Sequence, residues 1–173
     1  MKKLALLAAL PLLVGAGNLQ TSPELGQAEG RCRPNESGPA FLVRVVGLKD
    51  RVGWLKLEVY PSNDQDWLAD DNVLLNAGKT FRRLEIPVPQ TGTPELCIRV
   101  PAAGTYSLVL LHDRDMDHKF KWQVDGVGFG SNPRLGFSQP KADKARATAG
   151  SSPTRTSITL NYRRGLGMRP IND

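Results

Sequence analysis

The sequence predicts an all-β fold, a two-layer antiparallel β-sandwich of about seven short strands with one disulfide. Apolar and polar residues alternate along several short segments, which is typical of strands with one buried face. Glycine (17 residues) and proline (13 residues) are frequent, as expected where many strands are joined by tight turns. No long segment has the apolar periodicity of a helix, so the pattern favours a sandwich over a helical or mixed fold.

The N-terminal half of the expected domain contains four candidate strands, at residues 41–46, 52–60, 80–88 and 96–100. In the second of these, Leu55, Leu57 and Val59 share one side, which we expect to face the core. Residues 62–78 are rich in Asp, Asn and Ala and are expected to form a long loop or one short helix.

The C-terminal half begins with the most apolar segment, residues 104–112, which we expect to be the central strand. Tyr106 follows a glycine turn, where its hydroxyl can hydrogen-bond back to that turn as in sandwich corners. Residues 113–140 are expected to form a long connection with flexible turn glycines at Gly126, Gly128 and Gly130. A weak strand near 144–148 and a clear one over 156–162 complete an immunoglobulin-like or transthyretin-like domain at 40–165, followed by a basic tail at 166–173.

The N-terminus has the three parts of a secretory signal. Lys2 and Lys3 precede an apolar run from Leu4 to Val14, and small residues follow. The run is too short to span a bilayer, which takes about 20 apolar residues. We therefore expect a cleaved signal peptide at 1–17, cut after Ala16 or Gly17, and a periplasmic or secreted protein without a membrane-spanning segment. Residues 18–39 are expected to be a flexible lead-in.

The two cysteines, Cys32 and Cys97, are expected to form a disulfide in the oxidising compartment that this export implies. A ring closed across 65 residues (97 − 32) stabilises the fold by about 4 kcal/mol through the entropy of the unfolded chain. Because Leu96, Ile98 and Val100 are expected to face the core, Cys97 lies on the opposite side. The bond would then pin the lead-in against the outside of a sheet.

Composition and motifs exclude several classes of function. The net charge of +6 comes from scattered basic residues, without the clustered face that nucleic-acid binding needs. No serine or cysteine lies in a nucleophile motif, and there is no Cys-x-x-Cys pair. Trp54, Trp67 and Trp122 suit buried anchors better than a carbohydrate platform. We therefore expect a non-enzymatic binding or structural module of the cell envelope, with an envelope protein or a glycan as its partner.

The segment 112–119 is the most informative stretch for chemistry. Asp113, Asp115 and Asp117 stand at every second position, and their mutual repulsion favours a cation between them. The spacing matches the opening of a calcium loop, with Asp125 as a further candidate ligand. However, His118 stands where such a loop needs glycine, and Val124 where it needs glutamate.

Three alternatives remain open for this segment. The simplest is a solvated acidic turn that Arg114, Lys119 and Lys121 neutralise. A second is a zinc or copper site built from Asp113 with His112 and His118. The third is an envelope glycan hydrolase that uses a carboxylate of this loop together with His112.

Most of the chain after residue 40 resembles the exported family called domain of unknown function 2141. The ordered motifs that carry the resemblance are Val46-Gly47-Leu48-Lys49, Gly53–Tyr60, Gly104-Thr105-Tyr106, His112-Asp113, the acidic run with Asp115 and Asp117, Gly128–Pro133 and Asn161–Gly165. The resemblance implies an envelope or secreted β-sandwich with no established activity, and it supplies no catalytic residue. The family's usual run His-Asp-x-Asn-x-Asn-Gly is similar to a calcium loop, and this sequence has Asp115 and Asp117 in place of the amides and His118 in place of the glycine.

Overall fold

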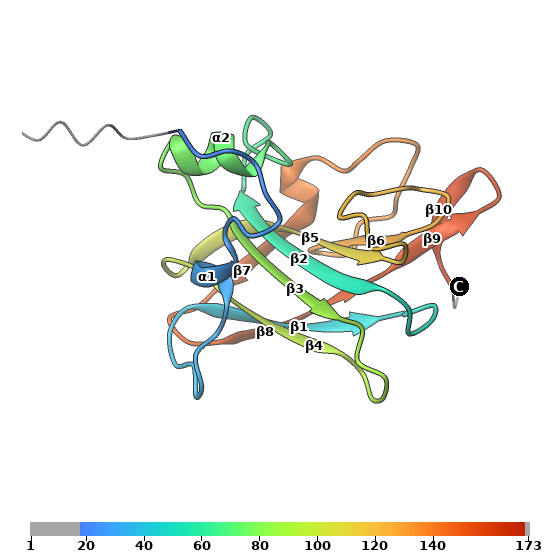
Figure 1. Ribbon diagram of the computed structural model, residues 1–173, viewed down its shortest axis with the longest axis horizontal. Coiled ribbons are helices and arrows are strands. Elements are labelled where there is room, and N and C mark those ends of the chain that lie inside the picture. The colour runs from blue at the N-terminus through green and yellow to red at the C-terminus, as the bar shows by residue number, and fades with distance from the viewer. Residues whose placement is uncertain (1–17, 172–173) are drawn as a thin grey trace, which may run out of the picture.

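The computed structural model describes residues 18–171, so the expected signal peptide lies outside the described residues. Within this range, ten strands form two sheets, with two short α-helices and one 3-10 helix (Figure 1). In chain order the elements are α1 (Gln27–Gly30), β1 (Ala40–Val46), β2 (Trp54–Pro61), α2 (Asp71–Asn76), β3 (Arg82–Pro87), β4 (Glu95–Arg99), β5 (Gly104–Asp113), β6 (Gly126–Phe129), η1 (Ala142–Ala145), β7 (Arg146–Ala149), β8 (Thr154–Thr159), β9 (Asn161–Arg164) and β10 (Gly167–Pro170).

The two sheets pack face to face, which confirms the all-β sandwich. The smaller sheet has the order β4-β1-β8, and the larger has the order β10-β9-β6-β5-β2-β3 with β7 paired to one end of β5 (Figure 1). Alternate residues of β1, β2, β4, β5 and β8 meet in one apolar core, including Phe41, Leu57 and Leu110. Leu55, Leu57 and Val59 are fully buried there, as the alternating pattern predicts.

Two predicted local features are confirmed. The hydroxyl of Tyr106 donates a 2.9 Å hydrogen bond to the carbonyl of Ala102 in the preceding turn. Cys32 and Cys97 form a disulfide, and Cys97 is half-buried between the buried neighbours Leu96 and Ile98. The bond therefore joins the N-terminal segment to the outward side of β4.

Pairing between distant strands differs from the simplest antiparallel sandwich. β1 pairs with β4 in the antiparallel sense but with β8 in the parallel sense, with Val43 opposite Thr156. The expected single strand at 156–162 is two strands, because the chain passes from the small sheet to the large one between Thr159 and Asn161. Leu160 at this crossing is fully buried in the core.

Two of the three glycines that the sequence predicts as flexible turn residues, Gly126 and Gly128, lie in a strand instead, whereas Gly130 lies in the turn that follows it. Gly126 and Gly128 lie within β6, and a Cβ at Gly126 would stand 2.3 Å from the ring of Tyr162. A Cβ at Gly128 would be 2.5 Å from Ile158 Cγ2. These positions let β6 lie close to β8 and β9, so glycine is required there for packing.

Both ends of the expected domain contact the large sheet. In the lead-in, the Arg83 guanidinium donates a 2.8 Å hydrogen bond to the Ser22 carbonyl, and the Arg83 backbone N–H donates to Gly26 at 3.1 Å. The expected basic tail contains β10, which pairs with β9 from Gly167 to Pro170. The segment expected as a basic tail at 166–173 therefore includes a strand of the large sheet.

A second apolar cluster covers part of the outer face of the large sheet. Tyr60, Trp67, Leu74 and Phe81 pack there with residues of β5, β6 and η1. Trp67 donates a 2.8 Å hydrogen bond to the carbonyl of Pro140, which holds the start of η1 against the sheet. The large sheet is thus buried on both faces where this cluster covers it.

The close packing at Gly126 gives a test with a matched control. We expect Gly126→Ala to lower the free energy of unfolding by about 1–3 kcal/mol, because the new methyl group overlaps the Tyr162 ring. Gly136→Ala, where a Cβ meets nothing within 4 Å, should change it by less than about 1 kcal/mol. Urea unfolding measures both, and equal midpoints for the two variants would contradict the packing role of Gly126.

Candidate functional site

The outer face of the large sheet has a pocket beside the second apolar cluster. Its volume is about 610 Å³. Val109 and Leu111 of β5 and Val127 and Phe129 of β6 line its sheet side. The other lining residues come from β2, β10, three loops and the turn between β9 and β10: Lys56, Glu58, Leu68, Phe120, Trp122, 135–140 and 166–168. Most of this lining is apolar, and its two charged groups are already compensated. Lys56 donates to the carbonyl of His118, and Glu58 pairs with Arg83 at 2.7 Å.

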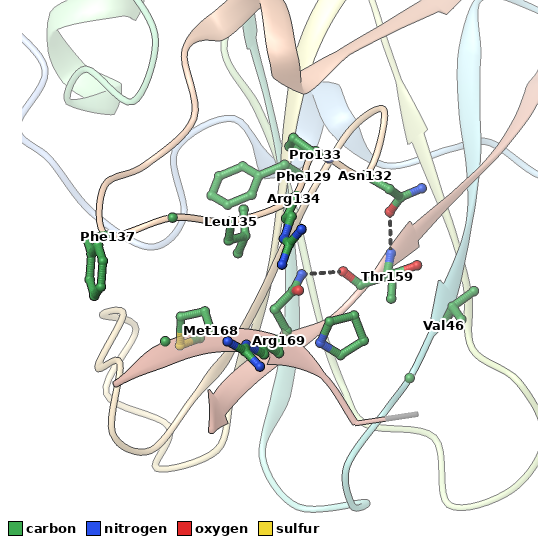
Figure 2. Close-up of a pocket in the computed structure, with 15 residues that line it drawn as sticks. Val46, Phe129, Asn132, Pro133, Arg134, Leu135, Phe137, Thr159, Met168 and Arg169 are labelled. Carbon is green, nitrogen blue, oxygen red and sulfur yellow. Dashed lines mark hydrogen bonds between the residues drawn. The ribbon is translucent and has the colours of Figure 1, made fainter. Parts of the chain in front are cut away.

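A second pocket of about 650 Å³ adjoins the first (Figure 2). The two share Phe129, Leu135, Gly136, Phe137, Gly167 and Met168 as lining residues. In Figure 2, Arg134 extends from the upper loop towards β9 and β10, and Phe137 stands at the outer end. The Phe137 side chain is 96% exposed, so one wall common to both pockets is an uncovered aromatic ring.

The loop at 130–137, which contributes lining residues to both pockets, is hydrogen-bonded to the sandwich at its base. The Asn132 side chain accepts a 2.7 Å hydrogen bond from the Thr159 N–H and donates one of 3.0 Å to the Ser157 carbonyl. Ser131 and Asn132 both have left-handed backbone conformations, with φ of 57° and 46°. Asparagine tolerates this conformation better than most residues, and here it turns the chain away from β6 while its amide fixes the loop to β8.

The charge of the second pocket is positive. Arg134 and Arg169 line it, and no Asp or Glu does. Within residues 18–171, neither arginine side chain has an ion-pair or hydrogen-bonding partner, and both residues are exposed. An apolar pocket therefore opens directly beside two uncompensated guanidinium groups, which suit the recognition of carboxylate or phosphate.

At the end of β5, the structure brings together three of the four predicted metal ligands. Asp113, Asp115 and Asp117 each place a carboxylate oxygen within 4.8 Å of the others. The Lys121 ammonium bridges Asp115 and Asp117 at 2.6 Å each. These hydrogen bonds raise the pKa of Lys121 and lower that of Asp117. The ammonium is thus a built-in cation for the two outer carboxylates.

Asp125 lies outside this group and holds the loop from within. Its carboxylate oxygens accept the backbone N–H groups of Arg114 at 2.9 Å and Lys121 at 2.8 Å, so it joins the two ends of the loop. Burial raises the pKa of Asp125 despite these bonds. The side chain of Arg114 adds an ion pair with Asp50 at 2.6 Å and a bond to the Val124 carbonyl.

His112 lies within the fold, away from solvent. It is fully buried, and its Nε2 donates a 2.7 Å hydrogen bond to the carbonyl of Val52. Its Nδ1 accepts the hydroxyl of Tyr162 at 2.7 Å, and that hydroxyl oxygen accepts the Lys49 N–H at 3.1 Å. Both ring nitrogens of His112 are therefore engaged within the interior of the fold.

His118 contacts Glu85, a residue that sequence reasoning missed. Its Nδ1 is 3.0 Å from Glu85 Oε1, and together with Asp113 these residues form a second group of closely placed ligand atoms. Glu85 lies in β3 and pairs with Lys56 of β2. In the sequence it stands between Leu84 and Ile86, as an ordinary outward-facing residue of a strand does. Only the pairing of β3 with β2 and of β2 with β5 brings it to the end of β5.

The three tryptophans do not form one carbohydrate platform. Trp67 is buried in the second apolar cluster, whereas Trp122 is exposed beside the first pocket with the Arg163 guanidinium 4.4 Å from its ring centre. Trp54 begins β2 opposite Pro87 and Asp113. Sequence reasoning also missed Arg134, Phe137, Met168 and Arg169, whose only local signal is the unusual position of Phe137 between glycine and serine.

The fold and its pockets define the class of protein: a β-sandwich domain with one disulfide and with pockets on the outer face of its large sheet. The chain belongs to the family described as "Uncharacterized protein conserved in bacteria (DUF2141)", whose model matches residues 43–157. This confirms the resemblance, although the motif at 161–165 lies beyond the matched residues. No curated protein and no solved structure matches the chain. Within residues 18–171, no helix has the length and apolar character needed to cross a membrane.

The burial of His112 predicts a pH dependence of stability. Burial lowers the pKa of His112 below its ordinary value of 6.5, so the unfolded chain takes up a proton there before the folded chain does. This contribution to stability is complete above about pH 6.5 and is lost as the pH falls towards the folded-state pKa, by at most about 1.4 kcal/mol per pH unit. Urea unfolding between about pH 7.5 and 5.5 should show this slope in the wild type and in His118→Gly but not in His112→Gln. A slope that persists in His112→Gln would refute the assignment.

Proposed function

We propose that this protein is an exported, non-enzymatic binding module of the cell envelope, and that its ligand is an amphipathic anion. The observation that carries the proposal is the pair of adjoining pockets on the outer face of the large sheet. One is lined mostly by apolar and aromatic side chains, and the other contains Arg134 and Arg169 with no acidic residue.

The chemistry of the two pockets indicates the ligand class. An acyl or aromatic group would bury itself against Val109, Leu111 and Phe129, a favourable change of about 25 cal/mol for each Å² of apolar surface removed from water. A carboxylate or phosphate at its end would lie beside Arg134 and Arg169. Because Phe137 lines both pockets, its exposed ring can close over the ligand where the two meet.

Two features support the cellular setting of the proposal. Residues 1–17 have the composition of a secretory signal, and the Cys32–Cys97 disulfide is the kind of cross-link that persists in an oxidising compartment. Two observations support the proposal that the module is non-enzymatic. Both nitrogens of the candidate base His112 are hydrogen-bonded inside the fold, and Glu58, the carboxylate that lines the first pocket, pairs with Arg83.

A pair of fluorescent probes tests the ligand class directly. The anionic probe anilinonaphthalene sulfonate and its uncharged counterpart phenylnaphthylamine have similar apolar bodies, so the ratio of their Kd values isolates the contribution of charge. We expect tighter binding of the anion, and a loss of about fivefold for each of Arg134→Gln and Arg169→Gln, corresponding to about 1 kcal/mol per exposed ion pair. Phe137→Ala should weaken the binding of both probes.

Arg44→Gln serves as the matched control, because Arg44 is an exposed arginine on β1 in the other sheet. It should leave both Kd values unchanged. Equal affinity for the two probes, or an equal loss in Arg44→Gln and Arg134→Gln, would contradict the proposal.

A second candidate is a calcium-stabilised domain, favoured by the convergence of Asp113, Asp115 and Asp117. A calcium ion between them has to displace the Lys121 ammonium. If it does, excess calcium at 100 times its Kd adds about 2.7 kcal/mol, and the thermal midpoint rises by about 5 °C or more relative to chelator. Asp115→Asn should abolish the rise and Lys121→Gln should enlarge it. Identical midpoints in calcium and chelator for the wild type and Lys121→Gln would exclude this candidate.

A further inference from the structure

Glu85, Asp113 and His118 come from three different parts of the chain and meet at the end of β5. Glu85 belongs to β3, Asp113 is the last residue of β5, and His118 lies in the loop that follows. Each offers one ligand atom, and these three atoms lie within 4.8 Å of one another. This group is separate from the amphipathic pockets, so what it binds goes beyond the function proposed above.

The two carboxylates of this group are buried with little compensation. Asp113 is fully buried and Glu85 is 8% exposed. Asp113 Oδ2 accepts the His118 N–H at 2.8 Å, but its Oδ1 has no hydrogen-bonding partner among the described residues. A buried acceptor without a partner costs about 1–3 kcal/mol, and a buried carboxylate without a counter-charge costs several. A cation at this point removes both costs.

Neighbouring cations do not supply that charge. Lys121 is bonded to Asp115 and Asp117, and Arg114 pairs with Asp50. Lys56 donates a 2.7 Å hydrogen bond to the His118 carbonyl, and the carboxylate nearest its ammonium is that of Glu58, at 3.9 Å. Among the described residues, the ion-pairing group within reach of Glu85 is the His118 imidazole itself.

The spacing and type of the ligand atoms favour a transition metal. His118 Nδ1 lies 3.0 and 3.2 Å from the two Glu85 oxygens. Two ligands each about 2.1 Å from one ion, at octahedral or tetrahedral angles, stand about 3.0–3.4 Å apart. A nitrogen ligand beside two carboxylates suits zinc and similar ions better than calcium, which takes oxygen ligands.

We propose that Glu85, Asp113 and His118 form a binding site for one divalent transition-metal ion, such as zinc. The His118 side chain is 43% exposed, so the ion enters from solvent past the imidazole and keeps water in its remaining positions. The two buried carboxylates balance its charge. The bound ion links β3 to the end of β5 and holds the loop that bears Asp115 and Asp117.

The backbone at His118 allows the imidazole to be removed without harming the fold. His118 has a left-handed conformation with φ of 63°, which costs a residue with a side chain about 1–2 kcal/mol relative to glycine. His118→Gly therefore relieves backbone strain while it deletes the ligand. Glu85→Gln removes a second ligand and keeps the size of the side chain.

The experiment is calorimetric titration of the untagged protein lacking residues 1–17 with zinc, and separately with calcium. Because the sequence has only two histidines and His112 is buried, His118 is the single accessible imidazole. We expect one zinc ion per chain, and a loss of at least about tenfold in zinc affinity in both His118→Gly and Glu85→Gln. Asp115→Asn and Asp117→Asn, in the neighbouring acidic group, should keep zinc affinity within about twofold.

A second readout tests ligation directly. Cobalt(II) bound in place of zinc absorbs visible light according to its ligands, and this spectrum should change in His118→Gly. The proposal is overturned if zinc does not bind, if its affinity is the same in His118→Gly as in the wild type, or if the cobalt spectrum does not change. Ion binding that is lost in Asp115→Asn but kept in His118→Gly would place the ion in the acidic loop and overturn the proposal as well.

Discussion

The backbone of β5 lies between two apolar layers, and both of its faces need a cover. Its inward residues Leu108 and Leu110 meet the small sheet, while Val109 and Leu111 point to the opposite side. On that side the second apolar cluster covers only part of the strand. The uncovered part forms the floor of the first pocket, so the site proposed for an amphipathic anion follows from a core that is complete on one face and incomplete on the other.

Along most of β5 the side chains pack in apolar surroundings, but the last two residues of the strand make polar contacts. His112 and Asp113 are both fully buried, yet they face different surroundings. His112 is held between Tyr162 and Val52, which ties β9 and the loop before β2 to the central strand. Asp113 lies close to Glu85 and His118, and its Oδ1 has no hydrogen-bonding partner within residues 18–171. His112 thus belongs to a structural hydrogen-bond network, and the next residue, Asp113, belongs to the proposed metal site.

Local sequence patterns predicted the features that depend on local physics. The alternation of Leu55, Leu57 and Val59 marked the core face of β2, and the position of Tyr106 after a turn predicted its hydrogen bond to that turn. The proximity of Asp113, Asp115 and Asp117 also follows from their spacing in one loop. In each case the interacting residues are close in sequence or share one strand.

The features that were missed depend on contacts between distant segments. In the sequence, Gly126 and Gly128 look like turn residues. Their role is to leave space for the side chains of Tyr162 and Ile158, which belong to strands about 30 residues further along the chain. The parallel pairing of β1 with β8 has no local signal. Glu85 becomes a candidate ligand only because β3 pairs with β2 and β2 pairs with β5. The two pocket arginines come together only because β10 lies beside the loop at 132–137.

The disulfide also determines how the domain would carry mechanical load. Cys32 and Cys97 enclose β1, β2 and β3 in a covalent ring with a sequence separation of 65. If tension pulls the two ends of the chain apart, residues 18–31 can peel away from β3 first, but the force then passes from Cys32 directly to β4. The enclosed strands bear no stretch, and the remaining load falls on β4 to β10, which include β5, β6 and β10 of the pocket lining. The disulfide would therefore keep β1, β2 and β3 from being extended, however the remaining strands respond to the tension.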